Sequence, residues 1–327
     1  MRIVVTGALG HIGSRLIRTL PRAFPGAELL LVDDLSTQRY CSLYDLPSIG
    51  RYRFIEADVA TDDLAPILSG ADVLVHLAAI TSPMSTHDRP GRTEEVNVYG
   101  TERVARACVA SGAALVFIST TSVYSGSPAL VDEQCALMPQ SPYAASKRRA
   151  EQCLEELGRT QGLRFITCRF GTIFGTSPGM RFHTAVNRFC FQASAGRPLT
   201  VWRTALDQKR PYLDLTDAVE AISFAIRSQL FDRRAYNVLT TNASVRSIVD
   251  IISSHVPNLA VSQIDVPIMN DLSYEVSTER LRAEGFVFRG SLTRGIRDTL
   301  RLLRGVPERP RVVGADSDDL ARRRLQS

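Results

Sequence analysis

Short apolar runs separated by amphipathic segments recur between residues 3 and 239 of this 327-residue chain. The runs have the length and the β-branched content of buried strands, and the segments between them carry apolar residues at helical spacing. Strands that alternate with helices in this way predict an α/β fold with a doubly wound parallel sheet. We expect the strands at residues 3–5, 29–32, 53–58, 72–79, 114–118, 164–168 and 235–239.

Three glycines follow the first of these runs. Gly7, Gly10 and Gly13 lie between that run and an amphipathic helix, and the second apolar run ends on Asp33. This order of strand, glycine turn, helix, strand and acid is the dinucleotide-binding fingerprint, in which the helix N-terminus faces a pyrophosphate. A carboxylate at Asp33 binds the adenosine ribose hydroxyls and repels a 2′-phosphate, so we expect NAD rather than NADP.

Residues that end the next strands are candidates for the same crevice, because parallel strands present their carboxyl ends to the ligand. Asp58 ends the third strand, where it can bind the adenine amino group or, as an equally good interpretation, cap the following turn. Ala78 and Ala79 end the fourth strand, and their small side chains leave room for the cofactor.

A tyrosine and a lysine stand four residues apart in Tyr143-Ala-Ala-Ser-Lys147, directly after Pro142. Proline favours the first turn of a helix, and residues four apart share one helical face. We expect the Lys147 ammonium to lower the pKa of Tyr143, so that the phenolate acts as a general base for a substrate hydroxyl. The hydroxyl residues 119–122 follow the fifth strand on the same ligand side.

Composition and charge narrow the function classes. The net charge is +5, but the 39 Lys and Arg residues are scattered, which argues against a nucleic-acid surface. The six cysteines and five histidines lack the spacing of disulfide frameworks or metal ligands, so we expect free thiols and no metal. The first apolar run is a strand rather than a leader, and no run reaches the roughly 18 residues of a bilayer span. We therefore expect a cytoplasmic protein without membrane contact.

Several motifs occur in the order known from one enzyme family: TGALGHIG, Asp33, Asp58-Val59, HLAA, Asn97-Val-Tyr-Gly-Thr101, STTSVY and SPYAASK. The chain resembles the extended short-chain dehydrogenases/reductases, and among them the nucleotide-sugar epimerases and dehydratases, over residues 1–305. The resemblance implies that Thr120 hydrogen-bonds the reacting hydroxyl, that Tyr143 is the base and that Lys147 also holds the nicotinamide ribose. The expected cofactor-binding residues are Gly7, Gly10, His11, Ile12, Gly13, Asp33, Asp34, Asp58, Val59, Leu77, Ala78, Ala79, Asn97, Tyr143, Lys147 and Phe170.

The second half of the chain resembles the family less closely. Gly171-Thr172 stands where the family usually has Phe-Asn, and residues 266–276 lack the second phosphate-binding arginine of many members. Arg210 matches a phosphate-binding arginine, whose forked guanidinium suits a diphosphate, with a surface ion pair as the alternative. The expected substrate-binding residues are Thr81, Thr120, Thr172, Arg181, Asn187, Trp202 and Arg210.

The resemblance also implies two domains and a dimer. We expect a Rossmann NAD-binding domain at 1–175 and 217–242, a smaller mixed α/β nucleotide-sugar-binding domain at 176–216 and 243–305, and a mobile tail at 306–327. A homodimer would pair the helices at 98–110 and 143–157 across a two-fold axis. We expect the outward faces of these helices to include Val104, Cys108, Cys153 and Leu157.

These features together predict an NAD-dependent nucleotide-sugar epimerase that acts at C4 through a transient 4-keto sugar. The alternatives on the same fold are a 4,6-dehydratase, a sugar-acid decarboxylase, a reductase and a catalytically silent NAD-sensing regulator. A dehydratase of this family has an Asp-Glu pair directly after the threonine, and Thr121-Ser122 occupies those positions here. Because these hydroxyls do not titrate near neutral pH, they argue against elimination. The nucleotide and the sugar stay open.

Overall fold

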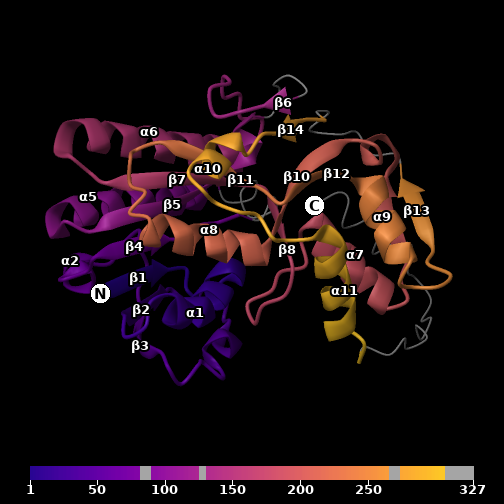
Figure 1. The fold of residues 1–327 in the computed structure, drawn as a ribbon, viewed down its shortest axis with the longest axis horizontal. Helices are drawn as coiled ribbons and strands as arrows, with labels where there is room; N and C mark the ends of the chain where they lie inside the picture. Colours follow the sequence, from indigo (N-terminus) through magenta and orange to yellow (C-terminus); the bar gives the residue numbers. More distant parts are fainter. Residues whose placement is uncertain (82–89, 125–129, 265–272, 306–327) are drawn as a thin grey trace.

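The computed structural model describes residues 1–81, 90–124, 130–264 and 273–305. These residues form two lobes, which lie side by side in Figure 1. The tail expected at 306–327 lies outside the described residues, as does most of the stretch 266–276.

The larger lobe is built on a parallel sheet of seven strands. In the order β11-β7-β5-β4-β1-β2-β3, the chain starts near the middle at β1, builds one edge first and then the other. This reversal is the doubly wound arrangement that the sequence predicts, so the α/β fold class is confirmed. The strands are β1 (Arg2–Thr6), β2 (Glu28–Asp33), β3 (Arg51–Glu56), β4 (Val73–His76), β5 (Ala114–Thr120), β7 (Phe165–Phe170) and β11 (Ala235–Val238).

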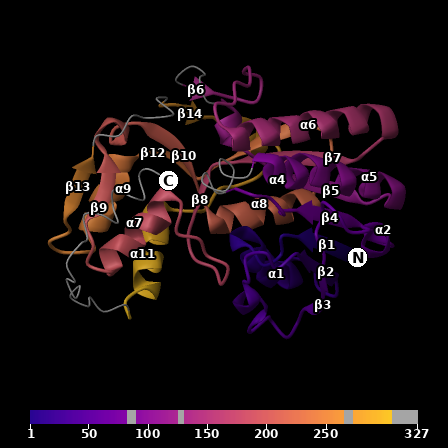
Figure 2. The ribbon, with the colours of Figure 1, turned by 180° about the vertical axis from the view of Figure 1, so that it is seen from behind.

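Helices cover both faces of this sheet, as Figures 1 and 2 show from opposite sides. One apolar core joins the sheet to α1 (His11–Ala23) and α8 (Leu215–Arg227). A second core joins the other face to α2 (Ala65–Leu68), α5 (Thr101–Ser111) and α6 (Pro142–Gln161). Because both faces are covered, the central strands are buried on both sides, which explains their continuous apolar runs.

The smaller lobe mixes strands and helices around a separate apolar core. A sheet of order β12-β10-β8 and the parallel pair of β9 and β13 are packed with three helices. Its main elements are β8 (Thr172–Phe174), α7 (Ala185–Ser194), β9 (Leu199–Trp202), β10 (Lys209–Asp214), β12 (Thr241–Ser244), α9 (Val245–Ser253), β13 (Val261–Ile264) and α11 (Leu292–Leu302). The short elements β6 (Leu130–Val131), β14 (Glu275–Val276) and α10 (Glu279–Ala283) lie where the two lobes meet (Figure 1).

The faces of α5 and α6 correct one sequence expectation. Val104 and Cys108 are fully buried, Leu157 is 3% exposed, and Cys153 is half-buried. These side chains pack toward the sheet in the second core, because they form the apolar stripe of each helix. The expectation that they face outward is wrong. In addition, α5 begins only at Thr101, after a π-helical turn over Glu95–Gly100.

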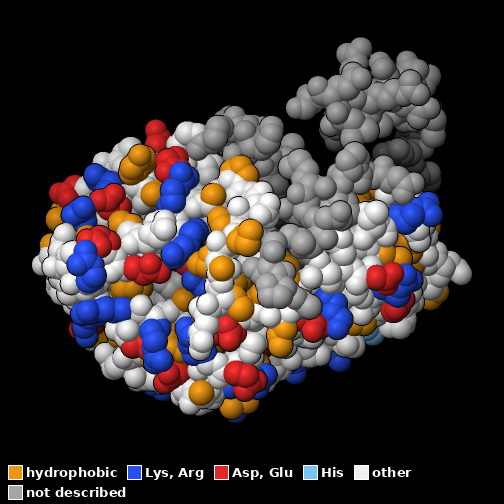
Figure 3. Space-filling model, turned by 90° about the horizontal axis from the view of Figure 1, so that it is seen from above, with side chains coloured by type: hydrophobic (Ala, Val, Ile, Leu, Met, Phe, Trp, Pro, Cys, Tyr) orange, Lys and Arg blue, Asp and Glu red, His pale blue; other side chains and the backbone are white. Residues whose placement is uncertain are grey.

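Three further observations concern the surface charge, the helices and the possible metal ligands of the described residues. In Figure 3, basic and acidic side chains are interspersed at the left, over the end of the molecule that holds α6 in Figure 1. None of the described helices is both long and apolar enough to cross a membrane. Within the same residues, no group of three or more His, Cys, Asp or Glu side chains could hold a metal ion.

Candidate active site

The glycine turn brings three backbone segments together after β1. Gly7 has a φ of +66°, and a Cβ at this position would lie 2.6 Å from the amide nitrogen of Ala78. A Cβ on Gly13 would lie 2.3 Å from the carbonyl oxygen of Gly7. Both positions therefore require glycine. The first turn of α1 has no side-chain cap, so its N–H groups are available to an anion in the cleft.

The cleft beside this turn contains a cavity of about 610 Å³, which we call the adenosine cavity. Asp33 lies on its wall, where its carboxylate accepts the N–H groups of Leu9 at 3.0 Å and Leu35 at 3.2 Å. Burial raises the pKa of Asp33, and these two hydrogen bonds oppose the rise. Since a carboxylate has about four acceptor positions, Asp33 can still receive the two hydroxyls of a ribose.

A second cavity of about 360 Å³ adjoins the first, and we call it the reaction cavity. Of the expected cofactor-binding residues, Asn97 alone lines neither cavity. Its buried amide binds the N–H and the carbonyl of Ile80 at 2.8 and 2.9 Å, so it shapes the loop after β4 instead. The adenosine cavity is lined by Gly7, Gly10, Asp33, Asp34, Asp58, Val59, Leu77, Ala78 and Ala79. The reaction cavity is lined by His11, Ile12, Gly13, Tyr143, Lys147 and Phe170.

The carboxylate of Asp58 is already engaged on the wall of the adenosine cavity. It forms an ion pair with Arg92, which lines the same cavity, and accepts the N–H of Ala60 at 2.9 Å. The turn-capping interpretation is thus what the structure shows. Contact between Asp58 and the adenine stays a prediction.

The reaction cavity collects hydroxyl groups from two strand ends and one helix start. Thr120 ends β5, and its hydroxyl donates to the Ser122 hydroxyl at 3.2 Å. Thr172 reaches the cavity from β8, and Tyr143 reaches it from the first turn of α6. This helix begins where it does because Ser141 caps its N-terminus, with its hydroxyl accepting the N–H of Ala144 at 3.2 Å.

The ionisation of Tyr143 differs from the sequence expectation. Burial raises the pKa of Tyr143 to about 12, and the cation that opposes this rise is Arg181 rather than Lys147. Lys147 is itself buried, which lowers its pKa to about 8, and its ammonium donates to the carbonyl oxygen of Ile118 at 2.8 Å. The expected lowering of the Tyr143 pKa by Lys147 is therefore wrong in this structure, because desolvation of the phenol dominates.

A buried ion pair supports α6 behind the reaction cavity. Glu151, one helical turn after Lys147, accepts the Ser119 hydroxyl at 2.5 Å. The same carboxylate pairs with Arg169 of β7 at 2.8 Å, and both side chains are less than 5% exposed. The pair therefore ties the helix that carries Tyr143 and Lys147 to two neighbouring strands of the sheet.

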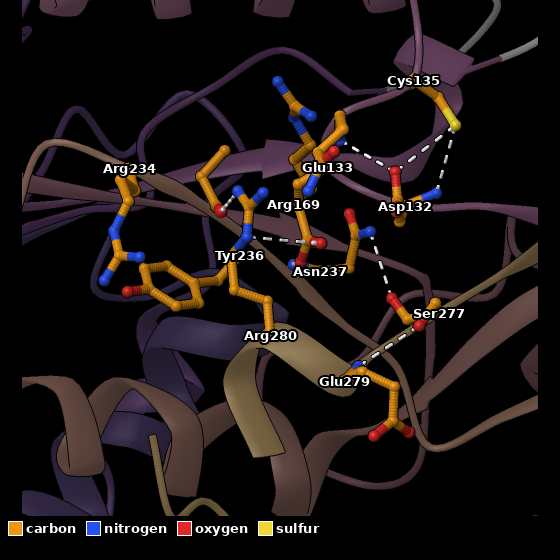
Figure 4. Close-up of polar contacts among 12 residues, drawn as sticks. Asp132, Glu133, Cys135, Arg169, Arg234, Tyr236, Asn237, Ser277, Glu279 and Arg280 are labelled. Atoms are coloured by element: carbon orange, nitrogen blue, oxygen red, sulfur yellow. Dashed lines mark hydrogen bonds and ion pairs between the residues drawn. The ribbon is translucent and has the colours of Figure 1, made fainter. Parts of the chain in front are cut away.

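Figure 4 shows how this polar network continues toward the smaller lobe. Arg169 donates to the Tyr124 hydroxyl at 2.6 Å, and that hydroxyl donates to the Asn237 side chain at 2.9 Å. Asn237 in turn donates its backbone N–H to Glu133 at 2.7 Å and its amide N–H to the carbonyl of Ser277 at 3.1 Å. Every one of these groups has a partner, so the network holds β7, β11 and the connections around them in one arrangement.

The expected substrate-binding residues fall into three groups. Thr81 and Arg181 line both cavities, with the Arg181 guanidinium donating to the Thr81 hydroxyl, while Thr120 and Thr172 line the reaction cavity. Asn187 lines neither, because its fully buried amide accepts the N–H of Gly175 at 3.2 Å and donates to the Arg181 carbonyl at 3.0 Å. The expected direct contact of Asn187 with a diphosphate is replaced by support of the backbone.

Trp202 and Arg210 are the third group and also lie outside the two cavities. Trp202 ends β9 with 43% of its surface exposed. The Arg210 guanidinium lies 5.4 Å from the ring centre of Tyr274, in cation–π geometry. Their contacts with substrate stay predictions.

Sequence reasoning missed several polar residues that line the cavities: Ser36, Thr37, Arg39, Arg92, His183 and Thr184. Arg39 follows Asp33 in the same loop, so its position after the acid was a usable signal. Arg92 reaches the cleft from the short helix α4 (Pro90–Glu94) and His183 from the loop before α7, and no local pattern marks them.

The order of these features along the chain agrees with a known family. A sequence model described as the NAD dependent epimerase/dehydratase family matches residues 3–238. This match includes the glycine turn, Asp33, Tyr143 and Lys147. The chain belongs to this family. The cofactor is NAD, and the narrow glycine turn, the open N-terminus of α1 and the Asp33 carboxylate fit it.

The chain is similar in sequence to curated proteins that are named for different reactions. The chain is 28% identical to the trifunctional UDP-glucose 4,6-dehydratase/UDP-4-keto-6-deoxy-D-glucose 3,5-epimerase/UDP-4-keto-L-rhamnose-reductase RHM3 of Arabidopsis thaliana, over 94% of this chain and 48% of that protein. It therefore spans about half the length of this relative. It is 30% identical to the uncharacterized UDP-glucose epimerase YtcB of Bacillus subtilis, over 77% of this chain and 81% of that protein.

A solved structure gives the same result for the fold. The Thermus thermophilus UDP-glucose 4-epimerase in complex with NAD is 27% identical, with a TM-score of 0.80 over 94% of this chain and 100% of that chain. Epimerases and dehydratases both occur among the relatives, so family membership is compatible with either reaction.

Proposed function

We propose that this protein is an NAD-dependent nucleotide-sugar epimerase that acts at C4 of the sugar. One observation carries the proposal: Thr120, Tyr143 and Lys147 converge on a reaction cavity that, among the described residues, is lined by no carboxylate. Such a site can move one proton to and from a hydroxyl, but it lacks the acid and base pair that elimination requires. The similarity to proteins named as UDP-glucose epimerases supports this interpretation.

In this proposal Tyr143 takes the proton of the C4 hydroxyl, and Thr120 bridges the phenol and that hydroxyl. NAD, when bound, supplies hydride transfer from C4 and back to the other face of the 4-keto sugar. Because burial raises the pKa of Tyr143 to about 12, its phenolate forms only when positive charge gathers in the cavity. Arg181 supplies part of that charge, and Lys147 holds the end of β5 beside the phenol.

A 4,6-dehydratase is the second candidate, because the relative RHM3 carries that activity in its name. Elimination would need acids near C5 and C6, and the first acidic residues after Thr120 in the chain are Asp132 and Glu133. Asp132 accepts the N–H of Gln134 at 2.9 Å, and Glu133 accepts the N–H of Asn237 at 2.7 Å. Neither lines the reaction cavity, which favours epimerisation.

The mass of the product tests the proposal. Purified enzyme is incubated with a panel of nucleotide hexoses and nucleotide hexuronic acids, and the products are separated and weighed by mass spectrometry. We expect a stereoisomer of unchanged mass, with the inverted carbon identified by NMR. Loss of one water would show a dehydratase, and loss of carbon dioxide a decarboxylase. A gain of two hydrogens at the expense of added NADH would show a reductase, and no conversion at all would favour a silent regulator.

Three further proposals concern organisation. We propose an NAD-binding domain at 1–175 and 217–242 and a nucleotide-sugar-binding domain at 176–216 and 243–305. We propose a homodimer through α5 and α6, supported by Tyr99, which is 55% exposed in the π-helical turn that precedes α5. Light scattering that shows a monomer at micromolar concentration would contradict it.

The six cysteines are free, as in a reducing compartment, and we propose a cytoplasmic location.

A further inference from the structure

The loop that leaves β8 crosses from the smaller lobe to the glycine turn, and in Figures 1 and 2 it extends toward α1. We call its residues Ser177–Arg181 the strap. Gly179 packs directly on the turn, since a Cβ there would lie 2.4 Å from the carbonyl oxygen of Leu9 and 2.6 Å from that of Gly10. Only glycine permits this approach of two backbones.

Hydrogen bonds hold the strap on the larger lobe. The Ser177 hydroxyl donates to the carbonyl of His11 at 2.9 Å, and the Gly179 N–H donates to the Ser14 hydroxyl at 3.0 Å. Arg39, from the loop after Asp33, donates to the Gly179 carbonyl at 2.9 Å. His11 and Ser14 belong to the first turn of α1, so the strap is fixed beside the N–H groups that face the cleft.

Arg181 ends the strap at the junction of the two cavities. The two cavities share several lining residues, including Gly7, Gly10, Leu77, Thr81, Arg181 and His183. Among them Arg181 carries the positive charge, because burial and nearby arginines lower the pKa of His183 to about 4. Its guanidinium donates to Thr81, but its Nε is buried without a hydrogen-bond partner. Within the described residues, no carboxylate lies within ion-pair distance of it. A guanidinium without a carboxylate partner, whose buried Nε lacks an acceptor, is suited to an oxyanion.

A dinucleotide that places its adenosine by Asp33 and its nicotinamide by Tyr143 must carry its pyrophosphate through this junction. We propose that the strap is a clamp on the NAD pyrophosphate, with Arg181 binding a phosphate oxygen opposite the N-terminus of α1. The anion would then be held from two sides, by helix N–H groups from the larger lobe and by a guanidinium from the smaller lobe. The Asn187 amide fixes the backbone of Arg181 and keeps the clamp in place.

The clamp implies that NAD leaves slowly, whichever nucleotide sugar the enzyme converts. The test is cofactor exchange in the holoenzyme: purified protein is mixed with excess isotopically labelled NAD, and retained cofactor is analysed by mass spectrometry over time. For Arg181→Gln we expect exchange at least about tenfold faster than in the unaltered protein, as for loss of one charge-assisted hydrogen bond. Arg181→Lys keeps a positive charge but loses the forked guanidinium, so its exchange rate should lie between those of the unaltered protein and Arg181→Gln.

Two further variants separate the clamp from general damage. Gly179→Ala keeps Arg181 but forces a Cβ into the glycine turn, and should also accelerate exchange. Arg246→Gln removes an arginine from an exposed pair with Asp207 in the smaller lobe, and should leave exchange unchanged. Circular dichroism and thermal melting establish that each variant is folded.

Unchanged exchange in folded Arg181→Gln would overturn the proposal. If the same variant raised the KM for the nucleotide sugar with exchange unaltered, Arg181 would serve an anionic group of the substrate, and the clamp would again be wrong. Because exchange is measured without turnover, the result is independent of whether the enzyme proves to be an epimerase or a dehydratase.

Discussion

The ammonium of Lys147 donates a hydrogen bond to the carbonyl oxygen of Ile118 at 2.8 Å, which joins α6 to the end of β5. One residue further along β5, the Ser119 hydroxyl donates to Glu151, one helical turn further along α6. Two successive contacts of this kind fix the position of the helix along the strand. They therefore set how Tyr143 lies relative to Thr120, which are the two groups that share the substrate hydroxyl in the proposed reaction.

Replacing Tyr143 with phenylalanine tests the base directly. The variant keeps the ring and removes the group that accepts the proton, so turnover should fall by roughly 10²-fold or more while KM changes little. Steady-state kinetics with the substrate found in the panel give both constants. A variant with nearly unaltered kcat would show that another group removes the proton.

Replacing Glu151 with glutamine tests the ion pair behind the cavity. The change leaves Arg169 charged and buried without its partner, which should lower the free energy of unfolding by about 3–5 kcal/mol. Urea denaturation gives this value. Glu156→Gln is the matched control on the same helix, because its pair with Arg159 is exposed, and it should have no measurable effect.

The same Glu151 variant should change the pH dependence of turnover. Burial lowers the pKa of Lys147 to about 8, and the negative charge of Glu151 limits that drop. Without this charge the pKa of Lys147 should fall further, so the ammonium is lost at a lower pH. We expect kcat to begin its alkaline decline at a lower pH in the variant than in the unaltered protein. If the decline begins at the same pH in both, deprotonation of Lys147 is not its cause.

The cofactor preference rests on Asp33. Mass spectrometry of cofactor released from the purified protein should find NAD or NADH, and NADP as the main species would contradict the assignment. In Asp33→Asn the charge that repels a 2′-phosphate is removed while an acceptor for Leu9 remains. Binding of NADP relative to NAD should therefore increase, as measured by competition with labelled NAD.

Acid should destabilise the fold through buried histidines. His76 is fully buried between the hydroxyls of Thr6 and Thr101, and burial lowers its pKa from 6.5 to about 3. The unfolded chain therefore binds a proton between pH 6.5 and 3 that the folded chain does not, so stability present above pH 6.5 is lost as the pH falls. The loss should approach about 1.4 kcal/mol per pH unit for each such histidine.

Urea denaturation of the unaltered protein at pH 7 and pH 5 measures this loss. In His76→Gln, stability should depend less on pH over this interval, although the variant starts from a lower value at pH 7. His255→Gln alters an exposed histidine and should keep the original pH dependence. An equal dependence in all three proteins would exclude His76 as a source of the effect.

The features that the sequence predicted correctly are local ones. Gly7, Gly13 and Asp33 lie in one continuous strand–turn–helix–strand unit, where spacing alone determines the geometry. Tyr143 and Lys147 likewise share one helix. Patterns of this kind specify which residues come together before the rest of the chain is considered.

The errors concern contacts between distant segments. Val104 and Cys108 have the spacing of an apolar stripe, but spacing does not say whether that stripe faces a sheet or a second subunit. The role of Asn187 depends on Arg181 in a separate loop, and the pKa of Tyr143 depends on how deeply both lobes bury it. Burial and long-range packing override local reasoning at these positions.

Strand β11 is added to the sheet from a part of the chain that follows the first segment of the smaller lobe, and α8 precedes it directly. No single cut can therefore separate the nucleotide-binding domain from every part of the smaller lobe. A fragment that stops at residue 216 would leave β7 as a bare sheet edge and uncover the apolar face that α8 packs against. Unpaired strand edges and exposed cores invite aggregation, so expression of such a fragment should end in inclusion bodies. Joining 1–175 to 214–242 through a short linker would instead keep β11 and the whole of α8 with its Asp214 cap.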